Sequence, residues 1–246
     1  MAKFEIRNLR KNYVNDGKLL PVLCGIDMAL EDGDFMVIAG QSGCGKTTLL
    51  RILAGLEEYD GGQLCTAGKM RIGMVFQEPR LMPWLSVYEN VAFGVEKPDR
   101  ARIMNLIGSV RLQGFENMKP AQLSGGMQHR TALARALALN PDVLLMDEPF
   151  AALDYFTRMT MQDLLIELYL REKVTVVFVT HSIDEALILG RHVALLGKGR
   201  ISDTYDLSSY AYPRDITLPE IAEMRKKILS RIMAPQSRVL SKEDTQ

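Results

Sequence analysis

The sequence is poor in the patterns that mark several large classes of protein. It has three cysteines among 246 residues, at positions 24, 44 and 65, and their spacing matches no metal site or disulfide framework. Basic and acidic residues each number 30, so the basic excess typical of nucleic-acid-binding proteins is missing. The longest apolar runs, such as 174–179, are too short to span a membrane, and the N-terminus lacks a signal-peptide core. We therefore expect a cytoplasmic chain with no nucleic acid among its partners.

The N-terminal part of the sequence has the patterns of an antiparallel β region followed by a buried strand. Apolar and polar residues alternate over residues 4–30, which predicts antiparallel strands broken at Asn15-Asp16-Gly17. The continuous apolar run 35–39 predicts a strand that is covered on both faces. A glycine-rich loop and a helix from Lys46 to Gly55 follow, and together they make one α/β unit.

The later part of the sequence predicts more of an α/β core. Apolar runs at 143–146 and 174–179 predict two further buried strands, and a helical pattern lies between them at about 157–171. Parallel strands joined by helices define this fold class. The segment 86–138 has helical patterns throughout.

We expect one domain over residues 1–246. Its core would comprise about 1–83 and 139–205, and the helical sub-domain of about 84–138 would be inserted between strands of that core. A C-terminal extension of about 206–246 would carry one more helix.

The loop after the first buried strand has the glycine, lysine and threonine pattern of a phosphate-binding loop. Glycines let backbone N–H groups turn toward phosphate, Lys46 can reach the β- and γ-phosphates, and Thr47 can bind Mg²⁺. We expect Cys44 to be a small loop residue and not a redox centre. The nucleotide-binding candidates here are Gly40, Gln41, Ser42, Gly43, Cys44, Gly45, Lys46, Thr47 and Thr48.

Two carboxylates end the buried strand at 143–146. Asp147 is the magnesium-side carboxylate expected of enzymes with a phosphate-binding loop, and Glu148 can act as the general base that polarises the attacking water. The alternative, an acidic strand end that only caps a helix, is weaker because the phosphate-binding loop would use these groups.

With Leu123-Ser-Gly-Gly-Met-Gln-His-Arg130 added to these motifs, the chain resembles the ATP-binding cassette (ABC) ATPases over nearly its whole length. This stretch is similar to the family's signature sequence, which other classes with a phosphate-binding loop lack. The resemblance implies an ABC ATPase fold, ATP and Mg²⁺ as cofactors, and further site residues. By resemblance, Gln77 contacts Mg²⁺ and the attacking water, His181 senses the γ-phosphate, and Tyr13 stacks on adenine. The signature and D-loop residues carried over are Ser124, Gly125, Gly126, Gln128 and Asp154.

The resemblance also implies partners. In this family one ATP is bound between the phosphate-binding loop of one chain and the signature helix of another. The two chains form a head-to-tail dimer, here expected to be a homodimer. The stretches 75–94 and 147–158 resemble the nitrate, sulfonate and taurine importer group. That resemblance implies membrane permease subunits, an extracytoplasmic solute-binding protein and a peripheral location on the inner face of the membrane. The alternative is a soluble ABC ATPase without a transporter, such as an assembly factor or a nucleic-acid-associated factor.

Three residues lead to separate expectations. His129 and Ser182 stand where the family usually has glutamine and aspartate, and we expect His129 to be a histidine on the helix surface. Trp84, the only tryptophan, follows the loop of Gln77, where the family docks a helix of the membrane subunit. Its alternative place is the core of the helical sub-domain.

Overall fold

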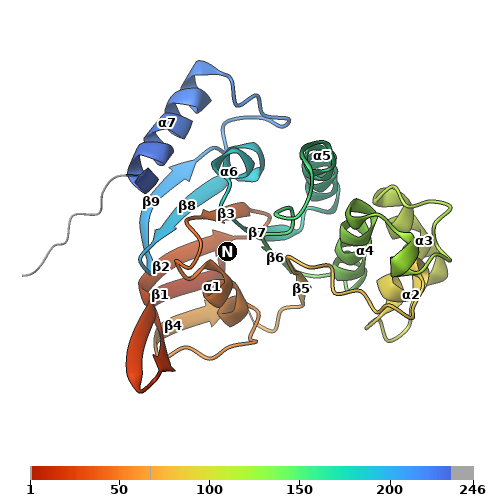
Figure 1. Ribbon diagram of the computed structural model, residues 1–246, viewed down its shortest axis with the longest axis horizontal. Helices are drawn as coiled ribbons and strands as arrows, with labels where there is room; N and C mark the ends of the chain where they lie inside the picture. Colours follow the sequence, from red (N-terminus) through yellow and green to blue (C-terminus); the bar gives the residue numbers. More distant parts are fainter. Residues whose placement is uncertain (1, 67, 234–246) are drawn as a thin grey trace, which may run out of the picture.

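Two β-sheets share one hydrophobic core in the computed structural model, which describes residues 2–66 and 68–233 (Figure 1). The strands are β1 (Ala2–Asn15), β2 (Lys18–Glu31), β3 (Phe35–Ala39), β4 (Gly61–Thr66), β5 (Ile72–Val75), β6 (Val143–Asp147), β7 (Thr175–Thr180), β8 (His192–Gly197) and β9 (Arg200–Asp206). The helices are α1 (Lys46–Leu53), α2 (Val87–Ala92), α3 (Arg100–Ser109), α4 (Gly125–Ala138), α5 (Tyr155–Glu172), α6 (Ile183–Leu189) and α7 (Pro219–Met233), with a 3-10 turn at Pro120–Gln122.

The smaller sheet is antiparallel and has the strand order β2-β1-β4. The larger sheet has the order β5-β6-β7-β3-β8-β9, in which β9 alone runs antiparallel to its neighbour. Every residue of β3, β6 and β7 is buried, as their continuous apolar sequences predict for central parallel strands. The antiparallel hairpin and these three strands confirm the sequence prediction.

The carboxyl ends of the central strands meet at one edge of the larger sheet. Ala39 of β3 pairs with Thr180 of β7, and Asp147 of β6 pairs with Val179. The segments that follow these three strands are the glycine-rich loop, Glu148 and His181. Ligands of open α/β sheets bind beyond this edge, so the topology brings the three segments to the place where a site is expected.

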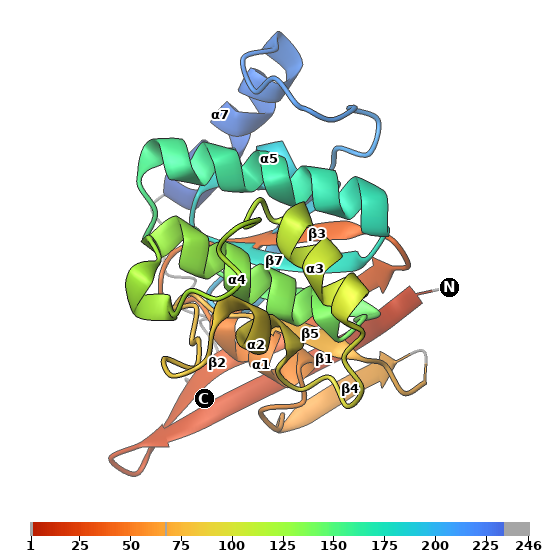
Figure 2. The same ribbon diagram turned by 90° about the vertical axis from the view of Figure 1, so that its right-hand side faces the viewer.

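Helices α2, α3 and α4 form a group at one side of the molecule (Figures 1 and 2), and α5 lies between this group and α6 (Figure 1). The prediction of helix throughout 86–138 was wrong in detail, because loops separate the three helices. Gly94 and Gly114 adopt positive φ values of 88° and 85° in these loops, and Pro98 lies just before α3.

The segment after residue 199 begins with a strand that the sequence patterns did not predict. It contains β9, whose residues alternate between exposed and half-buried along the edge of the sheet. Within residues 2–66 and 68–233, no helix has the length and apolar character needed to cross a membrane.

Candidate nucleotide-binding site

The glycine-rich loop joins β3 to α1, and its backbone admits little except glycine at two places. A Cβ atom at residue 40 would lie 2.2 Å from the carbonyl oxygen of Leu196. Gly45, the N-cap of α1, has a φ of 104°, and no side chain caps the helix there. No capping side chain competes for the first N–H groups of α1, which can donate to an anion.

Lys46 lies at the start of α1 with its side chain buried. Its ammonium group donates to the carbonyl oxygens of Gly40 at 2.9 Å and Gln41 at 3.0 Å, and it lies 3.2 Å from the Glu148 carboxylate. Two of the three N–H donors of the ammonium group thus serve backbone carbonyls, and the contact with Glu148 is an ion pair. An anion that binds Lys46 would compete with the Glu148 carboxylate for this charge.

Thr47 and Asp147 place two oxygens together between α1 and β6. The Thr47 hydroxyl donates to the Asp147 carboxylate at 3.0 Å. Burial raises the pKa of Asp147, and the Glu148 charge adds to this rise, whereas the Thr47 hydrogen bond, Arg51 and Lys46 oppose it. A hydroxyl and a carboxylate are hard oxygen ligands, and Mg²⁺ is held in proteins by one or two carboxylates, so this pair fits that cation.

Glu148 and His181 meet across the ends of β6 and β7. Oε2 of Glu148 lies 2.7 Å from Nδ1 of His181, and the backbone N–H of Glu148 donates to Val179 at 3.0 Å. Glu148 has a φ of 44°, in the left-handed region that few residues other than glycine adopt. Strain of this kind is typical of functional sites, and here it accompanies a carboxylate held by both a lysine and a histidine.

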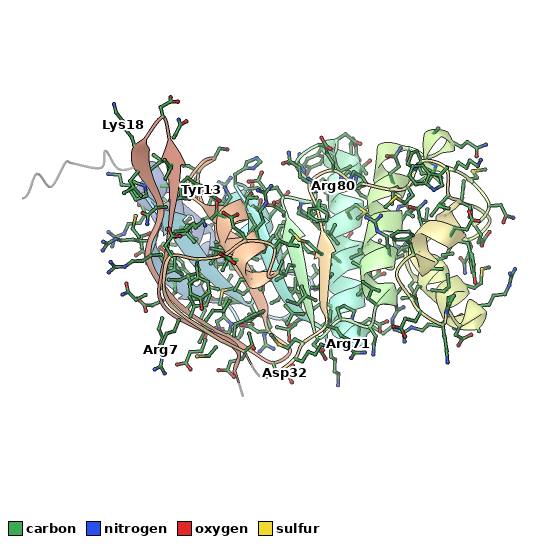
Figure 3. The ribbon with its side chains drawn as sticks, turned by 90° about the horizontal axis from the view of Figure 1, so that it is seen from below. Arg7, Tyr13, Lys18, Asp32, Arg71 and Arg80 are labelled. Carbon is green, nitrogen blue, oxygen red and sulfur yellow. The ribbon has the colours of Figure 1, made fainter. Side chains whose placement is uncertain are left out.

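Lys46, Thr47 and Glu148 line a cavity of about 450 Å³. Tyr13 enters it from β1, and its hydroxyl bonds to the Glu57 carboxylate and lies 3.4 Å from the Thr48 hydroxyl (Figure 3). Burial and the Glu57 hydrogen bond raise the pKa of Tyr13. The residues that line the cavity are Tyr13, Val22, Ser42, Gly43, Gly45, Lys46, Thr47, Thr48, Gln77 and Glu148.

The remaining residues of the loop face elsewhere. Gly40, Gln41 and Cys44 line a second cavity, of about 480 Å³, on the side of the loop toward β8 and α7. The Gln41 side chain donates to the carbonyl oxygen of Ile232 at 3.3 Å. Burial raises the pKa of the Cys44 thiol, as suits an unreactive small residue.

The signature residues form a separate group at the starts of α4 and α5. Ser124 caps α4 by accepting from the N–H of Met127 at 3.3 Å, and Asp154 caps α5 by accepting from Thr157 at 3.1 Å. A Cβ atom at Gly126 would lie 2.6 Å from the Thr157 methyl group, so the two helix starts touch. Among the residues that line the 450 Å³ cavity, none comes from 124–128 or is Asp154.

The expectation for His129 was wrong, because its side chain is buried. Its ring nitrogens lie 2.9 Å from the Gly125 carbonyl oxygen and 3.1 Å from that of Gln77. Arg135 of the same helix donates to Pro79 and Arg80, which lies beside α4 and α5 in Figure 3. Both links were missed from the sequence, although residues 132–138 of α4, apolar except for Arg135, are a signal of a buried helix.

A glycine-rich loop between a central parallel strand and a helix, with Lys46 and a strand-end aspartate beside it, defines a nucleotide-binding protein of the phosphate-loop class. Residues 23–151 match the family described as ABC transporter. The chain belongs to this family. The predicted resemblance, the α/β fold class and the ATPase class are therefore confirmed.

Relatives with known names match over most of their length. The aliphatic sulfonates import ATP-binding protein SsuB of Bacillus subtilis is 43% identical over 231 residues, which cover 89% of this chain and 90% of that protein. An uncharacterized ABC transporter ATP-binding protein of Methanocaldococcus jannaschii is 44% identical, with 93% and 91% covered.

Solved structures match as well. The cassette MJ0796, solved as a dimer in a post-hydrolysis state with ADP and Pi, has a TM-score of 0.74 and 31% identity over 83% of this chain and 98% of that chain. CbiO1 of Clostridium perfringens, part of the transporter complex CbiONQ, has a TM-score of 0.77 and 26% identity, with 95% and 96% covered.

Proposed function

We propose that this chain is the ATP-hydrolysing subunit of a membrane importer. The observation that carries the proposal is the contact of Glu148 with both Lys46 and His181 at the mouth of the phosphate-binding loop. It joins a residue that can bind phosphate, a carboxylate that can accept a proton from water, and a histidine that can orient that carboxylate. The family match and the importer relatives support the same conclusion.

The residues around the cavity fit ATP and Mg²⁺. The N–H groups at the start of α1 and Lys46 would hold the phosphates, and Tyr13 would stack on adenine. Thr47, Asp147 and Gln77 would hold Mg²⁺, which supplies charge neutralisation for the phosphates when it is bound. A phosphate that draws Lys46 away from Glu148 leaves that carboxylate to His181 and to water.

The exposed starts of α4 and α5 support a head-to-tail dimer. Ser124, Gly125 and Asp154 are exposed, and they lie outside the cavity that Lys46 faces. In the proposed dimer, this group of one chain faces the phosphates bound by the other chain, and two-fold symmetry makes two such sites. The dimeric state of the solved cassette MJ0796 supports the arrangement.

Trp84 supports a permease surface beside the loop of Gln77. Its side chain is 67% exposed, whereas the buried Asn90 accepts from the N–H of Met82 and donates to the carbonyls of Met82, Leu85 and Ser86. Asn90 thus fixes the turn that presents Trp84, and a rigid exposed tryptophan is a common binding hot spot. Hydrogen bonds of His129 and Arg135 connect residues 77–80 of the same loop to α4. A displacement of α4 would therefore also displace Gln77 and Trp84.

The relatives also suggest the solute and the remaining partners. Several are ATP-binding proteins for the import of aliphatic sulfonates, so a small organic anion of this kind is the proposed solute. A solute-binding protein outside the membrane and a location on its inner face go with this proposal. The helical sub-domain of about 84–138 would then be the part that meets the permease. The relatives give no support to the alternative of a soluble ABC ATPase without a transporter.

Glu148→Gln tests the catalytic assignment. The amide keeps the shape of the side chain but cannot act as a base, so ATP binding should persist while turnover falls by about two to four orders of magnitude. Turnover of the purified chain and binding of a fluorescent ATP analogue measure the two effects. Glu58→Gln changes an exposed glutamate beyond α1 and is the matched control. Turnover of Glu148→Gln close to that of the parent would contradict the assignment.

A further inference from the structure

Arg158, one turn into α5, has an incompletely paired guanidinium. Its Nη2 donates to the carbonyl oxygen of Leu153 at 2.9 Å, in the turn that leads to Asp154. Its Nε is buried and, within the residues that the structure describes, is the one buried side-chain nitrogen or oxygen with no hydrogen-bond partner. Buried polar groups are nearly always paired, so an exception of this kind calls for a reason.

Glu185 of α6 is the ion-pair partner of this Nε–H. Oε1 of Glu185 lies 3.8 Å from Nε, which is within ion-pair distance but beyond that of a hydrogen bond. Glu185 as a whole is 5% exposed, and burial raises the pKa of its carboxyl group, against the opposing effects of Thr180, Arg158 and His181. An approach of less than about 1 Å would complete the charge-assisted hydrogen bond between the two side chains.

Glu185 in turn holds the backbone on both sides of His181. Its Oε2 accepts from the Thr180 hydroxyl at 2.5 Å, and that hydroxyl accepts from the N–H of Ser182 at 2.9 Å. The Ser182 hydroxyl accepts from the backbone N–H of Glu185 at 3.3 Å. A shift of the Glu185 carboxylate would therefore be passed to the loop that aims His181 at Glu148.

We propose that Arg158 is a positioning residue that couples the Leu153–Asp154 turn to the orientation of His181, through Glu185 and Thr180. The inference rests on the proposed function, in which Asp154 meets a second chain and His181 and Glu148 act on ATP. Contact of a partner with the turn moves Arg158 toward Glu185, and closing that pair fixes the His181 loop. Because the Nε–H of Arg158 has no hydrogen-bond partner, the Arg158–Glu185 pair has two possible arrangements. One is the open pair of this structure, and the other is a closed pair joined by a hydrogen bond.

The test compares Arg158→Met, Glu185→Gln, the double variant and Arg158→Lys in the purified chain. The methionine keeps the length of the side chain without donors, and the double variant also removes the buried carboxylate that Arg158→Met leaves without its cation. Arg171→Met is the matched control, since Arg171 is exposed on the same helix and pairs with its neighbour Glu172.

For Arg158→Met we expect kcat to fall about tenfold while KM for ATP stays within about twofold. Arg158→Lys should recover part of kcat because it restores a donor and the charge. The double variant should be no slower than Arg158→Met, because both changes break the same link. The chain has three histidines, so the imidazole signal of His181 can be followed by NMR, and it should shift in Arg158→Met but not in Arg171→Met.

A kcat within twofold of the parent, additive losses in the double variant, or an unmoved His181 signal would each overturn the inference. A purely structural role would lower the melting temperature without the split between kcat and KM. Glu148→Gln, measured in the same series, separates this inference from the proposed function. Its full activity would overturn the catalytic assignment, whereas its inactivity beside an unaffected Arg158→Met would overturn the coupling alone.

Discussion

Two helices of this chain begin in ways that suit an anion, yet they begin differently. At the start of α1, Gly45 caps the helix without a side chain, and Lys46 and Thr47 beside it are buried or half-buried. At the start of α4, the Ser124 side chain accepts from Met127 N–H, and Ser124 and Gly125 are exposed. The first helix start leaves its amides to a ligand, whereas the second is already stabilised by its own serine.

The side chains around the two helix starts also differ, because those around α1 are better suited to binding phosphate. Around α1 the chain supplies a cation, two carboxylates and a histidine from three neighbouring strand ends. Around α4 it supplies Asp154 and the Thr157 methyl group, but no side chain that reaches the cavity of Lys46. One chain thus contains a nearly complete phosphate site and a separate half-site, as expected if the two are joined only between chains.

The largest effect is expected when the two helix starts are damaged in different chains. Lys46→Ala and Ser124→Arg should each abolish most ATPase activity of the pure variant, since every site in such a dimer carries a lesion. In a mixed dimer, one composite site carries both lesions and the other carries neither. Mixing the two inactive chains should therefore restore part of the activity, up to about a quarter of the parent's in an equal mixture if the intact site works alone.

The control for this experiment is a mixture in which Lys46→Ala is combined with a chain that carries both changes. No dimer in that mixture has an intact composite site, so activity should stay at the level of the single variants. If the signature served the nucleotide of its own chain, mixing the single variants would give no recovery either, and the comparison of the two helix starts would fail.

A smaller effect on stability is expected at Asp147, the buried carboxylate beside α1. Burial raises its pKa in the folded state, so the folded chain binds this proton more tightly than the unfolded chain does. Ionised Asp147 therefore lowers the free energy of unfolding, and this cost disappears as the pH falls below the unfolded value of about 4. Asp147→Asn should raise the urea midpoint at pH 7.5 and leave it unchanged near pH 4.

These unfolding measurements need a chain free of nucleotide and Mg²⁺, because either ligand would favour the folded state. Asp163→Asn, which changes an exposed carboxylate on α5, is the matched control and should move neither midpoint. A midpoint for Asp147→Asn below that of the parent at pH 7.5 would show that the carboxylate stabilises the free protein, contrary to its buried position.

The difference between the two regions also shows what the sequence could predict. The α1 site depends on a contiguous motif and on strand ends that a parallel sheet must bring to one edge, so its members could be named in advance. The links around α4 and α5 join residues far apart, as His129 and Gln77 are, and Arg158 and Glu185 are. No local pattern marks such pairs, because they depend on how α4, α5 and α6 pack against the sheet.

The smallest effect on the isolated chain is expected at Trp84, on the loop that joins the two regions. Because the side chain is exposed and Asn90 holds the turn from within, Trp84→Ala should leave the urea midpoint and ATP affinity unchanged. Binding to the permease in detergent should weaken by about tenfold or more, as at a hot spot. Leu56→Ala, at an apolar residue beyond α1 that is 63% exposed, is the control and should bind normally.

The same tryptophan reports on its own surroundings, since the chain has no other. Its emission should be red-shifted and accessible to iodide in the free chain, and it should move to the blue and become protected when the permease binds. Blue and protected emission in the free chain would place Trp84 in a core. Unchanged emission on assembly would show that the permease meets another surface, and the loop would then join the two regions without presenting a docking residue.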